Sequence, residues 1–326
     1  MSDSANTTQP ISPAMERRAR GALVIVGLMV MIVAVLLPVV IFSLSRSLQS
    51  VEEHPVYNLV TGNLETNIEA KEGDDVTFAN ISIVSIDEST RAATLLVSGN
   101  RNCGKLCVKL DIEVYSLASE GSLRRGLPPS VALNVPEASG PLTETVTLPV
   151  SGNPQRYPFD EYTLVLGMTA RATRPDGGVI SVPLQQMTQR SVLTVDSSLV
   201  RLSMHTPTPL DPAAMTPAGS EAPFLFAQKL VFSRPLYLQI ICTLLVMLIS
   251  ASGFFALWTQ TLRQLSLGIG GLILGIWGVR SIVIQGNLPE VTVVDSVLAI
   301  IILLLLLGVA VRVALAVRSQ TGWGEH

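Results

Sequence analysis

The sequence predicts a membrane protein of mixed α and β structure, in which four transmembrane helices carry an antiparallel β-sandwich outside the membrane. Three observations lead to this class. Hydrophobic residues make up 48% of the 326 residues and charged residues only 14%, against roughly 25% charged residues in soluble proteins. Long apolar runs lie near the N-terminus and in the last third of the chain. Between them, apolar and polar side chains alternate with a period of two, which is typical of β-strands.

The apolar runs set the domain boundaries, because about 20 apolar residues in a helix cross the ~30 Å hydrocarbon core of a bilayer. Residues 1–20 are predicted to be a disordered cytoplasmic tail, and residues 319–326 a second cytoplasmic tail. The extracytoplasmic β-sandwich is expected at residues 45–232. The four predicted transmembrane helices are residues 21–44, 233–259, 264–286 and 294–318.

Basic residues orient these helices. Arg17, Arg18 and Arg20 precede the first run, so the positive-inside rule places the N-terminus in the cytoplasm and the middle segment outside. Arg263 then falls in a cytoplasmic loop. The first run is longer than the ~7–15 residues of a signal-peptide core and lacks a good cleavage site, which favours an uncleaved signal anchor. The predicted location is the plasma membrane of a cell envelope, with several crossings and both termini in the cytoplasm.

The middle segment contains several predicted strands. Residues 108–114 alternate apolar and charged side chains, so one face of this strand meets a core and the other meets water. Residues 205–223 are rich in proline and are expected to form a loop or linker. Residues 224–232 are a last strand that runs directly into the second span. Similar short runs bounded by turn residues are 76–86, 91–98, 142–150, 162–170, 179–187 and 191–203.

The most distinctive local motif is Tyr157-Pro158-Phe159-Asp160, which comes just before a predicted strand. We expect a structural role for it. Pro158 is expected to fix the start of the strand, and Phe159 to fill the core near the membrane. Asp160 is expected to bind backbone N–H groups of the turn.

Arg234 and Pro235 link the last predicted strand to the second span. Together with the motif at residues 157–160, they resemble the outer domain and first span of pentameric ligand-gated (Cys-loop) channels, which implies an oligomeric ion channel. Nearly the whole chain more closely resembles a family of four-span membrane proteins with a domain of unknown function, in which one N-terminal span, a β-rich domain and three C-terminal spans recur. The third span has almost no polar side chain between its ends, which argues against a wet pore.

The third span carries a stripe of glycines instead. Gly268, Gly271, Gly275 and Gly278 fall on one helical face, and small residues at this spacing let helix backbones approach closely in lipid. The pattern predicts helix packing, within the chain or between copies. A functional hinge is the alternative.

Arg280 is a charge inside an apolar run. At 1.5 Å per residue it lies roughly 8 Å from the outer edge of the membrane core, a distance that its side chain can largely span by reaching toward water. We expect a structural anchor paired with Glu290 or Asp295, and a substrate or gating role is the alternative.

Cys103 and Cys107 flank a short turn between two predicted strands. In an oxidising space outside the cytoplasm they are a candidate disulfide. A metal site would need more ligands than the sequence supplies nearby. Free thiols are the remaining alternative.

The sequence contains no catalytic, cofactor or metal motif, so no enzyme activity and no cofactor is predicted. A net charge of −3 offers no basic surface for nucleic acid. The expected partners are the lipid bilayer and either itself or another membrane protein. We expect a non-enzymatic binding, assembly or sensing protein, with an oligomeric channel or transporter as the alternative. The first place to look for function is the junction where Arg234, the motif at residues 157–160 and Glu290 are expected to meet.

Overall fold

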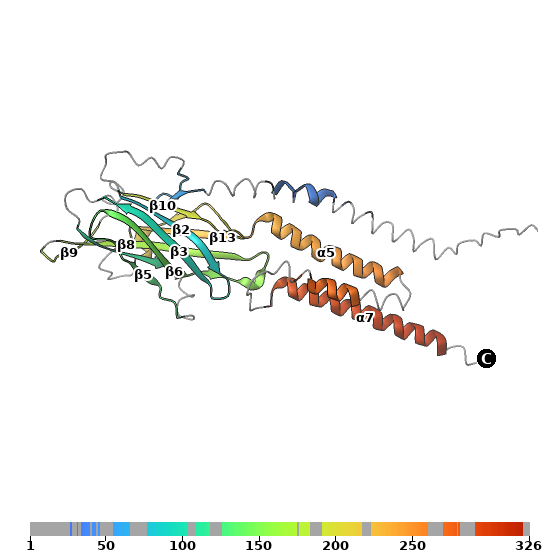
Figure 1. Cartoon of the computed structure of the whole chain (residues 1–326). Helices are drawn as coiled ribbons and strands as arrows, with labels where there is room; N and C mark the ends of the chain where they lie inside the picture. The colour runs from blue at the N-terminus through green and yellow to red at the C-terminus, as the bar shows by residue number, and fades with distance from the viewer. Residues whose placement is uncertain are drawn as a thin grey trace, which may run out of the picture. The chain divides into compact units, whose positions relative to one another are not determined.

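The computed structural model describes residues 27, 31, 34–39, 41–43, 45, 55–65, 77–102, 108–117, 126–174, 176–182, 191–216, 223–259, 270–278, 280 and 291–321. The chain divides into two compact units. The β-rich unit comprises Ser47–Gln239 and Ile284–Ser296, and the helical unit comprises Met1–Arg46, Ile240–Val283 and Val297–His326. Figure 1 shows the strands of the β-rich unit and the long helices α5 and α7.

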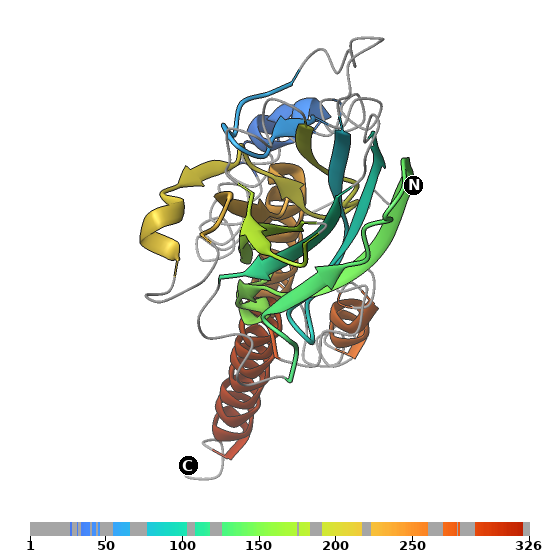
Figure 2. The same ribbon diagram turned by 90° about the vertical axis from the view of Figure 1, so that its left-hand side faces the viewer.

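The β-rich unit is built from two sheets, which Figure 2 shows from a second direction. The first sheet has the order β1 (Tyr57–Asn58), β10 (Ser191–Ser197), β2 (Thr77–Asp87), β3 (Ala92–Arg101) and β6 (Gly140–Pro149). The second has the order β11 (Ser203–Met204), β13 (Phe226–Ser233), β8 (Glu161–Thr173), β4 (Lys109–Ser116) and β5 (Ser130–Leu133). Three short strands complete the second sheet: β7 (Ser151–Gly152) and β9 (Val179–Ser181) pair with β8, and β12 (Thr208–Leu210) pairs with β13.

One hydrophobic core joins the two sheets. Ile83 and Leu95 of the first sheet belong to the same buried cluster as Leu164 and Phe232 of the second, and all four side chains are fully buried. Strand β8 buries alternate residues over its first half, as the period-two pattern predicts. Two sheets that share one core are the arrangement expected for a sandwich.

The predicted strands are confirmed in most of the described residues, but the prediction of a purely antiparallel sandwich is wrong for one pair. Strands β10 and β2 run parallel, from Ser191 opposite Thr77 to Ser197 opposite Ile83. A parallel pair needs a long crossover connection instead of a hairpin. Here more than a hundred residues separate the two strands, so the alternation of apolar residues gave no sign of their relative direction.

The proline-rich segment predicted as a loop contains regular structure. Strand β12 places Pro209 opposite Gln228 of β13, which a short strand at the edge of a sheet tolerates. The short helix α4 (Pro212–Met215) follows. The Asp211 side chain accepts a hydrogen bond from the Ala213 N–H at 3.0 Å and so caps this helix.

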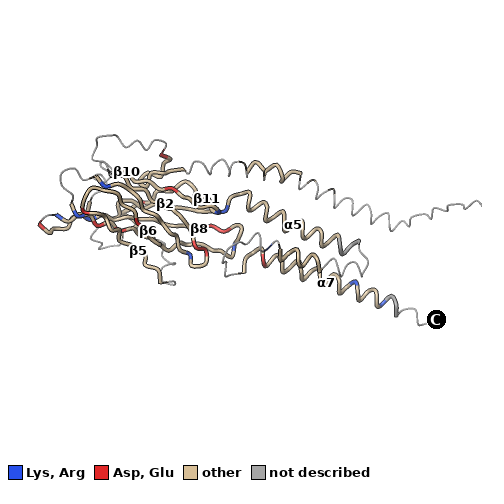
Figure 3. Tube along the Cα trace, viewed as in Figure 1, with Lys and Arg blue, Asp and Glu red and all other residues tan. Residues whose placement is uncertain are grey.

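Among the residues that the structure describes, two helices are long and apolar enough, by length and composition, to cross a membrane. Helix α5 (Leu236–Thr259) and helix α7 (Val293–Thr321) contain the candidate spans Leu236–Phe255 and Val293–Arg318. Figure 3 shows α5 without charged residues, whereas α7 has an acidic residue at its start and basic residues only toward its end. The described parts of the other two predicted spans, residues 34–39, 41–43, 270–278 and 280, are also helical.

Candidate functional site

The pairing of β13 with β8 places Arg234 opposite Asp160. The antiparallel register runs without interruption from Phe226 opposite Met168 to Ser233 opposite Glu161. One further step along both strands brings residue 234 to residue 160. Side chains two residues apart point to the same face of a strand, so Asp160 shares the core-facing side with Tyr162. The end of the last strand and the start of the central strand therefore bring opposite charges together.

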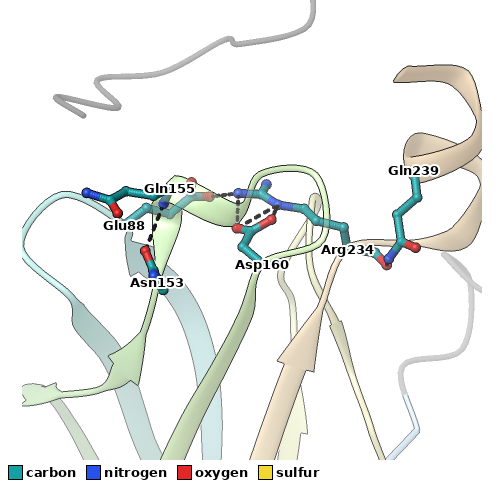
Figure 4. A network of polar contacts seen from close by, with 6 residues as sticks. All are labelled: Glu88, Asn153, Gln155, Asp160, Arg234 and Gln239. Atoms are coloured by element: carbon teal, nitrogen blue, oxygen red, sulfur yellow. Dashed lines mark hydrogen bonds and ion pairs between the residues drawn. The ribbon is translucent and has the colours of Figure 1, made fainter. Parts of the chain in front are cut away.

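Arg234 and Asp160 form a bidentate ion pair (Figure 4). The Arg234 Nε lies 3.0 Å from Asp160 Oδ1, and Nη2 lies 2.9 Å from Oδ2. The side chains are only 2% and 0% exposed, respectively. A buried charge is tolerated when it is paired with good geometry, and the planar guanidinium matches the carboxylate in this way.

Glu88 adds a second carboxylate from the other sheet. It lies in the turn between β2 and β3, and its Oε1 is 2.5 Å from Arg234 Nη2, with the Glu88 side chain 20% exposed. The Asp87 carboxylate holds this turn by accepting hydrogen bonds from the N–H groups of Ser89 and Thr90 at 2.9 and 3.2 Å. Burial acts to raise the pKa of Asp87, but these hydrogen bonds outweigh it and lower the pKa. Arg234 thus ties the two sheets together at one end of their shared core.

The residues just before β8 complete this cluster around Arg234. The 3₁₀ helix η1 (Pro154–Arg156) starts with the Asn153 Oδ1 accepting a hydrogen bond from the Gln155 N–H at 3.1 Å. Tyr157 follows and is buried, and its ring lies 4.9 Å from the Arg234 guanidinium carbon. The Tyr157–Pro158 peptide bond is cis. A cation over an aromatic face is attracted by the negative charge of that face, so Tyr157 favours the charged state of Arg234.

Tyr162 closes the core side of the cluster. Its side chain is fully buried, and the hydroxyl makes no hydrogen bond of normal geometry to another described residue. Burial raises the pKa of Tyr162, and the negative charges of Glu88 and Asp160 raise it further. The ring packs on Gly152, where an added Cβ would lie 2.3 Å from Tyr162 Cδ1. Gly152 is therefore required for this close approach.

The ion pairs of Arg234 with Asp160 and Glu88, which we call the clamp, are suited to a permanent structural contact and not to proton transfer. Burial acts to lower the pKa of Arg234, but the hydrogen bonds and charges of Asp160 and Glu88 outweigh it and raise the pKa. Arg234 therefore remains a cation at every physiological pH. No group of three or more His, Cys, Asp or Glu residues among the described residues is arranged to hold a metal ion.

The clamp lies immediately before α5. The Pro235 carbonyl accepts hydrogen bonds from the N–H groups of Leu238 and Gln239 at 3.0 and 3.4 Å, which begins the helix. The Gln239 side-chain Nε2 donates to the Arg234 carbonyl at 3.1 Å. The direct passage from the last strand into the second predicted span is confirmed.

The motif at residues 157–160 differs in part from expectation. Phe159 is 56% exposed, so the prediction that it fills the core is wrong; Tyr157 and Pro158 occupy the buried positions instead. Asp160 binds the Arg234 side chain, in place of the backbone N–H groups that we expected. The expected meeting of Arg234 with this motif is confirmed. Glu88 was missed, because a charged residue in a turn gives no sign of a distant partner.

The predicted glycine stripe is not tested. Gly268 lies outside the described residues, and a Cβ added to Gly271, Gly275 or Gly278 would meet no atom of the described residues within 4 Å. Close helix packing within the helical unit occurs at Gly253 of α5 instead. An added Cβ there would lie 2.8 Å from Leu305 Cδ2 of α7.

The remaining predicted residues stay predictions. Cys103, Cys107 and Glu290 lie outside the described residues. The Arg280 guanidinium lies over the Trp277 ring, 5.8 Å from its centroid. Asp295 Oδ2 accepts hydrogen bonds from the Thr292 N–H and hydroxyl, both at 3.0 Å, and so caps the start of α7.

Comparison with known protein families finds one match within the β-rich unit. Residues 68–203 match the family described as "Domain of unknown function (DUF4436)". Comparison with curated proteins finds no match. The matched region includes Glu88 and Asp160 and ends before Arg234. It agrees with the predicted similarity to a domain of unknown function, and the comparisons give no support to the resemblance to pentameric channels.

Proposed function

We propose that the protein is a four-span, non-enzymatic protein of the cell envelope that holds a β-sandwich outside the membrane and uses it for binding, assembly or sensing. The observation that carries this proposal is the junction between strand and helix. Strand β13 ends at Ser233, α5 begins at Leu236, and Arg234 between them is clamped by carboxylates from both sheets. A ligand or partner on the sheets would thus be connected to the membrane helix through a short and fully ordered link.

The starts of the two long helices support three C-terminal crossings. The first residues of α5, up to Gln239, and the first residues of α7, up to Ser296, both belong to the β-rich unit. If both helices cross the membrane, both start on the same side of it. The chain between them must then return across the bilayer, and the apolar residues 264–286 are long enough for that third crossing.

Charge supports the orientation of this arrangement. Arg312 and Arg318 lie in the second half of α7, and its first turn carries Asp295. Basic residues gather on the cytoplasmic side of membrane helices. The end of α7 and the tail after it therefore belong in the cytoplasm, and the β-rich unit lies on the opposite side.

The test combines topology with identification of partners. In a chain whose three native cysteines are replaced by Ser, a cysteine replacing Val179, which is 60% exposed on β9, should react with a membrane-impermeant maleimide in intact cells. A cysteine replacing Thr321 should react only after the membrane is opened. The reverse pattern would refute the proposed orientation. Purification in mild detergent, followed by mass measurement and identification of co-purifying proteins, then tests for binding or assembly; a constant, tightly bound partner supports the proposal.

An oligomeric channel or transporter, the function that the resemblance to pentameric channels implies, is the second candidate. The two short motifs that carry the resemblance to pentameric channels, at residues 157–160 and at Arg234, are in direct contact through Asp160. Five-fold particles and ion conductance in planar bilayers would support this candidate. A monomeric mass without conductance would eliminate it.

A further inference from the structure

The strand topology gathers several loops at the end of the β-rich unit that contains Arg234. Strands β2 and β10 run toward the same end of the unit, and β10 ends at Ser197 opposite Ile83, four residues before β2 ends at Asp87. Strand β11 begins opposite the end of β13, with Ser203 paired to Ser233. The loop at residues 198–202 therefore lies at the same end as η1 and the turn that carries Glu88. We call this surface the Arg234 end.

Two apolar side chains at the Arg234 end point into solvent. Phe159 is 56% exposed, and Val200 is 90% exposed, the highest exposed fraction of any large apolar residue described. Their neighbours are held in place: Pro158 and Leu202 are buried. Each exposed apolar side chain is thus presented by an ordered loop, and exposing both to water is unfavourable.

The chain itself identifies what covers these side chains. Leu236, two residues after Arg234, begins a candidate span of mean hydropathy 2.1 and is itself 56% exposed. If α5 crosses the membrane, the Arg234 end lies at the boundary between water and lipid. Apolar and aromatic side chains at this boundary insert among the lipid headgroups and upper acyl chains.

We propose that the Arg234 end is a lipid-binding surface, in which Phe159 and Val200 insert into the outer leaflet of the bilayer and fix the β-rich unit against it. This inference rests on the proposed function, because it requires α5 to span the membrane. It adds a contact between the folded domain and lipid that the helices alone do not provide.

The charges at this end indicate which lipids are suitable. Arg156 and Arg201 are exposed beside the two apolar side chains, and guanidinium groups hydrogen-bond to lipid phosphates. Asp87 and Glu161 are exposed at the same end and offset these positive charges. Insertion is therefore driven by apolar contact and does not require anionic lipid, so a zwitterionic phosphatidylcholine bilayer is a sufficient probe.

The test places a polarity-sensitive fluorophore on the full-length chain in phosphatidylcholine nanodiscs. Cys103, Cys107 and Cys242 are replaced by Ser, and NBD is attached to a single new cysteine in Val200→Cys. The matched control is Val179→Cys, since Val179 is an exposed valine on β9, which pairs with the opposite end of β8. Nitroxide-labelled phosphatidylcholine should cause about a two-fold loss of fluorescence and a blue shift at position 200, because the probe lies in the interface. Position 179 should show neither.

Equal, weak quenching at both positions in a chain that is incorporated into nanodiscs would overturn the lipid contact and leave the proposed function intact. A chain that fails to float with vesicles would instead refute the membrane anchoring itself. A blue shift at position 200 without quenching would show that protein covers this surface, which also overturns the inference. If the serine replacements prevent folding, benzoyl-phenylalanine in place of Phe159 in the otherwise unchanged chain gives the answer: cross-linking to lipid supports the inference, and cross-linking to protein or no cross-linking opposes it.

Discussion

Replacing Asp160 with Asn is the most direct test of the clamp. The substitution preserves the shape of the side chain and removes its charge, which leaves the 2% exposed Arg234 with Glu88 as its remaining carboxylate. Removing one partner of a buried ion pair costs about 3–5 kcal/mol, and we expect the lower end of this range because Glu88 still faces the buried guanidinium. For a unit of this size, 1 kcal/mol shifts the melting temperature by roughly 2–4 °C. We therefore expect Asp160→Asn to melt on the order of 10 °C below the unchanged protein.

Two further variants show whether burial sets the size of the effect. Glu88→Gln should cost less, about 1–2 kcal/mol, because the Glu88 side chain is 20% exposed and solvent screens its charge. Glu161→Gln is the matched control: Glu161 is the next residue after Asp160 but is exposed on the other face of the strand. Its effect should stay within about 0.5 kcal/mol.

The assay is thermal unfolding of the full-length protein in mild detergent. Circular dichroism monitors the loss of β-sheet signal, which comes from the β-rich unit. All variants are compared at one heating rate, since unfolding of membrane proteins is often irreversible. The double variant Arg234→Met with Asp160→Asn should lose less stability than the sum of the two single variants, because it leaves no unpaired charge at the two fully buried positions. Equal melting of Asp160→Asn and Glu161→Gln, or strict additivity in the double variant, would refute the reasoning.

Three further predictions concern other parts of the chain. Tyr162→Phe should leave stability at pH 7 nearly unchanged, because its hydroxyl makes no well-formed hydrogen bond. Burial raises the pKa of Tyr162 in the folded state, so the unfolded chain loses this proton at a lower pH than the folded chain does. As the pH rises above about 10, Tyr162 therefore lowers the stability of the fold, and it has no such effect below that pH. Melting curves from pH 7 to 11 should fall less steeply in the variant. Gly152→Ala should destabilise by about 1–3 kcal/mol through its clash with the Tyr162 ring, whereas a stability equal to the unchanged protein would contradict that packing. Gly253→Val should lower the stability of the helical unit through its contact with Leu305; Gly275→Val should instead dissociate any oligomer and leave the monomer folded, and light scattering in detergent distinguishes the two.

The fold was predictable where hydrophobic periodicity acts locally. Residues 108–114 alternate along β4, and the predicted run at 162–170 lies within β8. The direction of β10 relative to β2 was not predictable, because both strands would bury the same alternate residues in either orientation. A sequence pattern reports which side of a strand is buried. It does not report which strand lies beside it.

The site was predictable in part for a similar reason. Arg234 was singled out because it stands between a strand and an apolar helix, and Asp160 because it belongs to a compact turn motif. Their contact depends on the register of β13 against β8, which only the folded sheet sets. The assignment of Phe159 to the core followed its apolar character. In the folded chain Tyr157 is buried against Arg234 and Phe159 is exposed.

The clamp also explains how an arginine is accommodated at the start of α5. A cation near a helix N-terminus is unfavourable, because the helix dipole places partial positive charge there. Arg234 stands one residue before the Pro235 carbonyl that begins the helix. Asp160 and Glu88 together carry more negative charge than Arg234 carries positive charge, so the net charge of the cluster beside the helix N-terminus is negative and favourable. The same pairing lets Arg234 stand on the extracytoplasmic side of the proposed topology against the positive-inside rule, since a cation already neutralised within the folded domain no longer acts as a free positive charge. The carboxylates therefore serve both the β-rich unit and the helix that follows it, which is why we expect Asp160→Asn to have a larger effect than the loss of an ordinary ion pair.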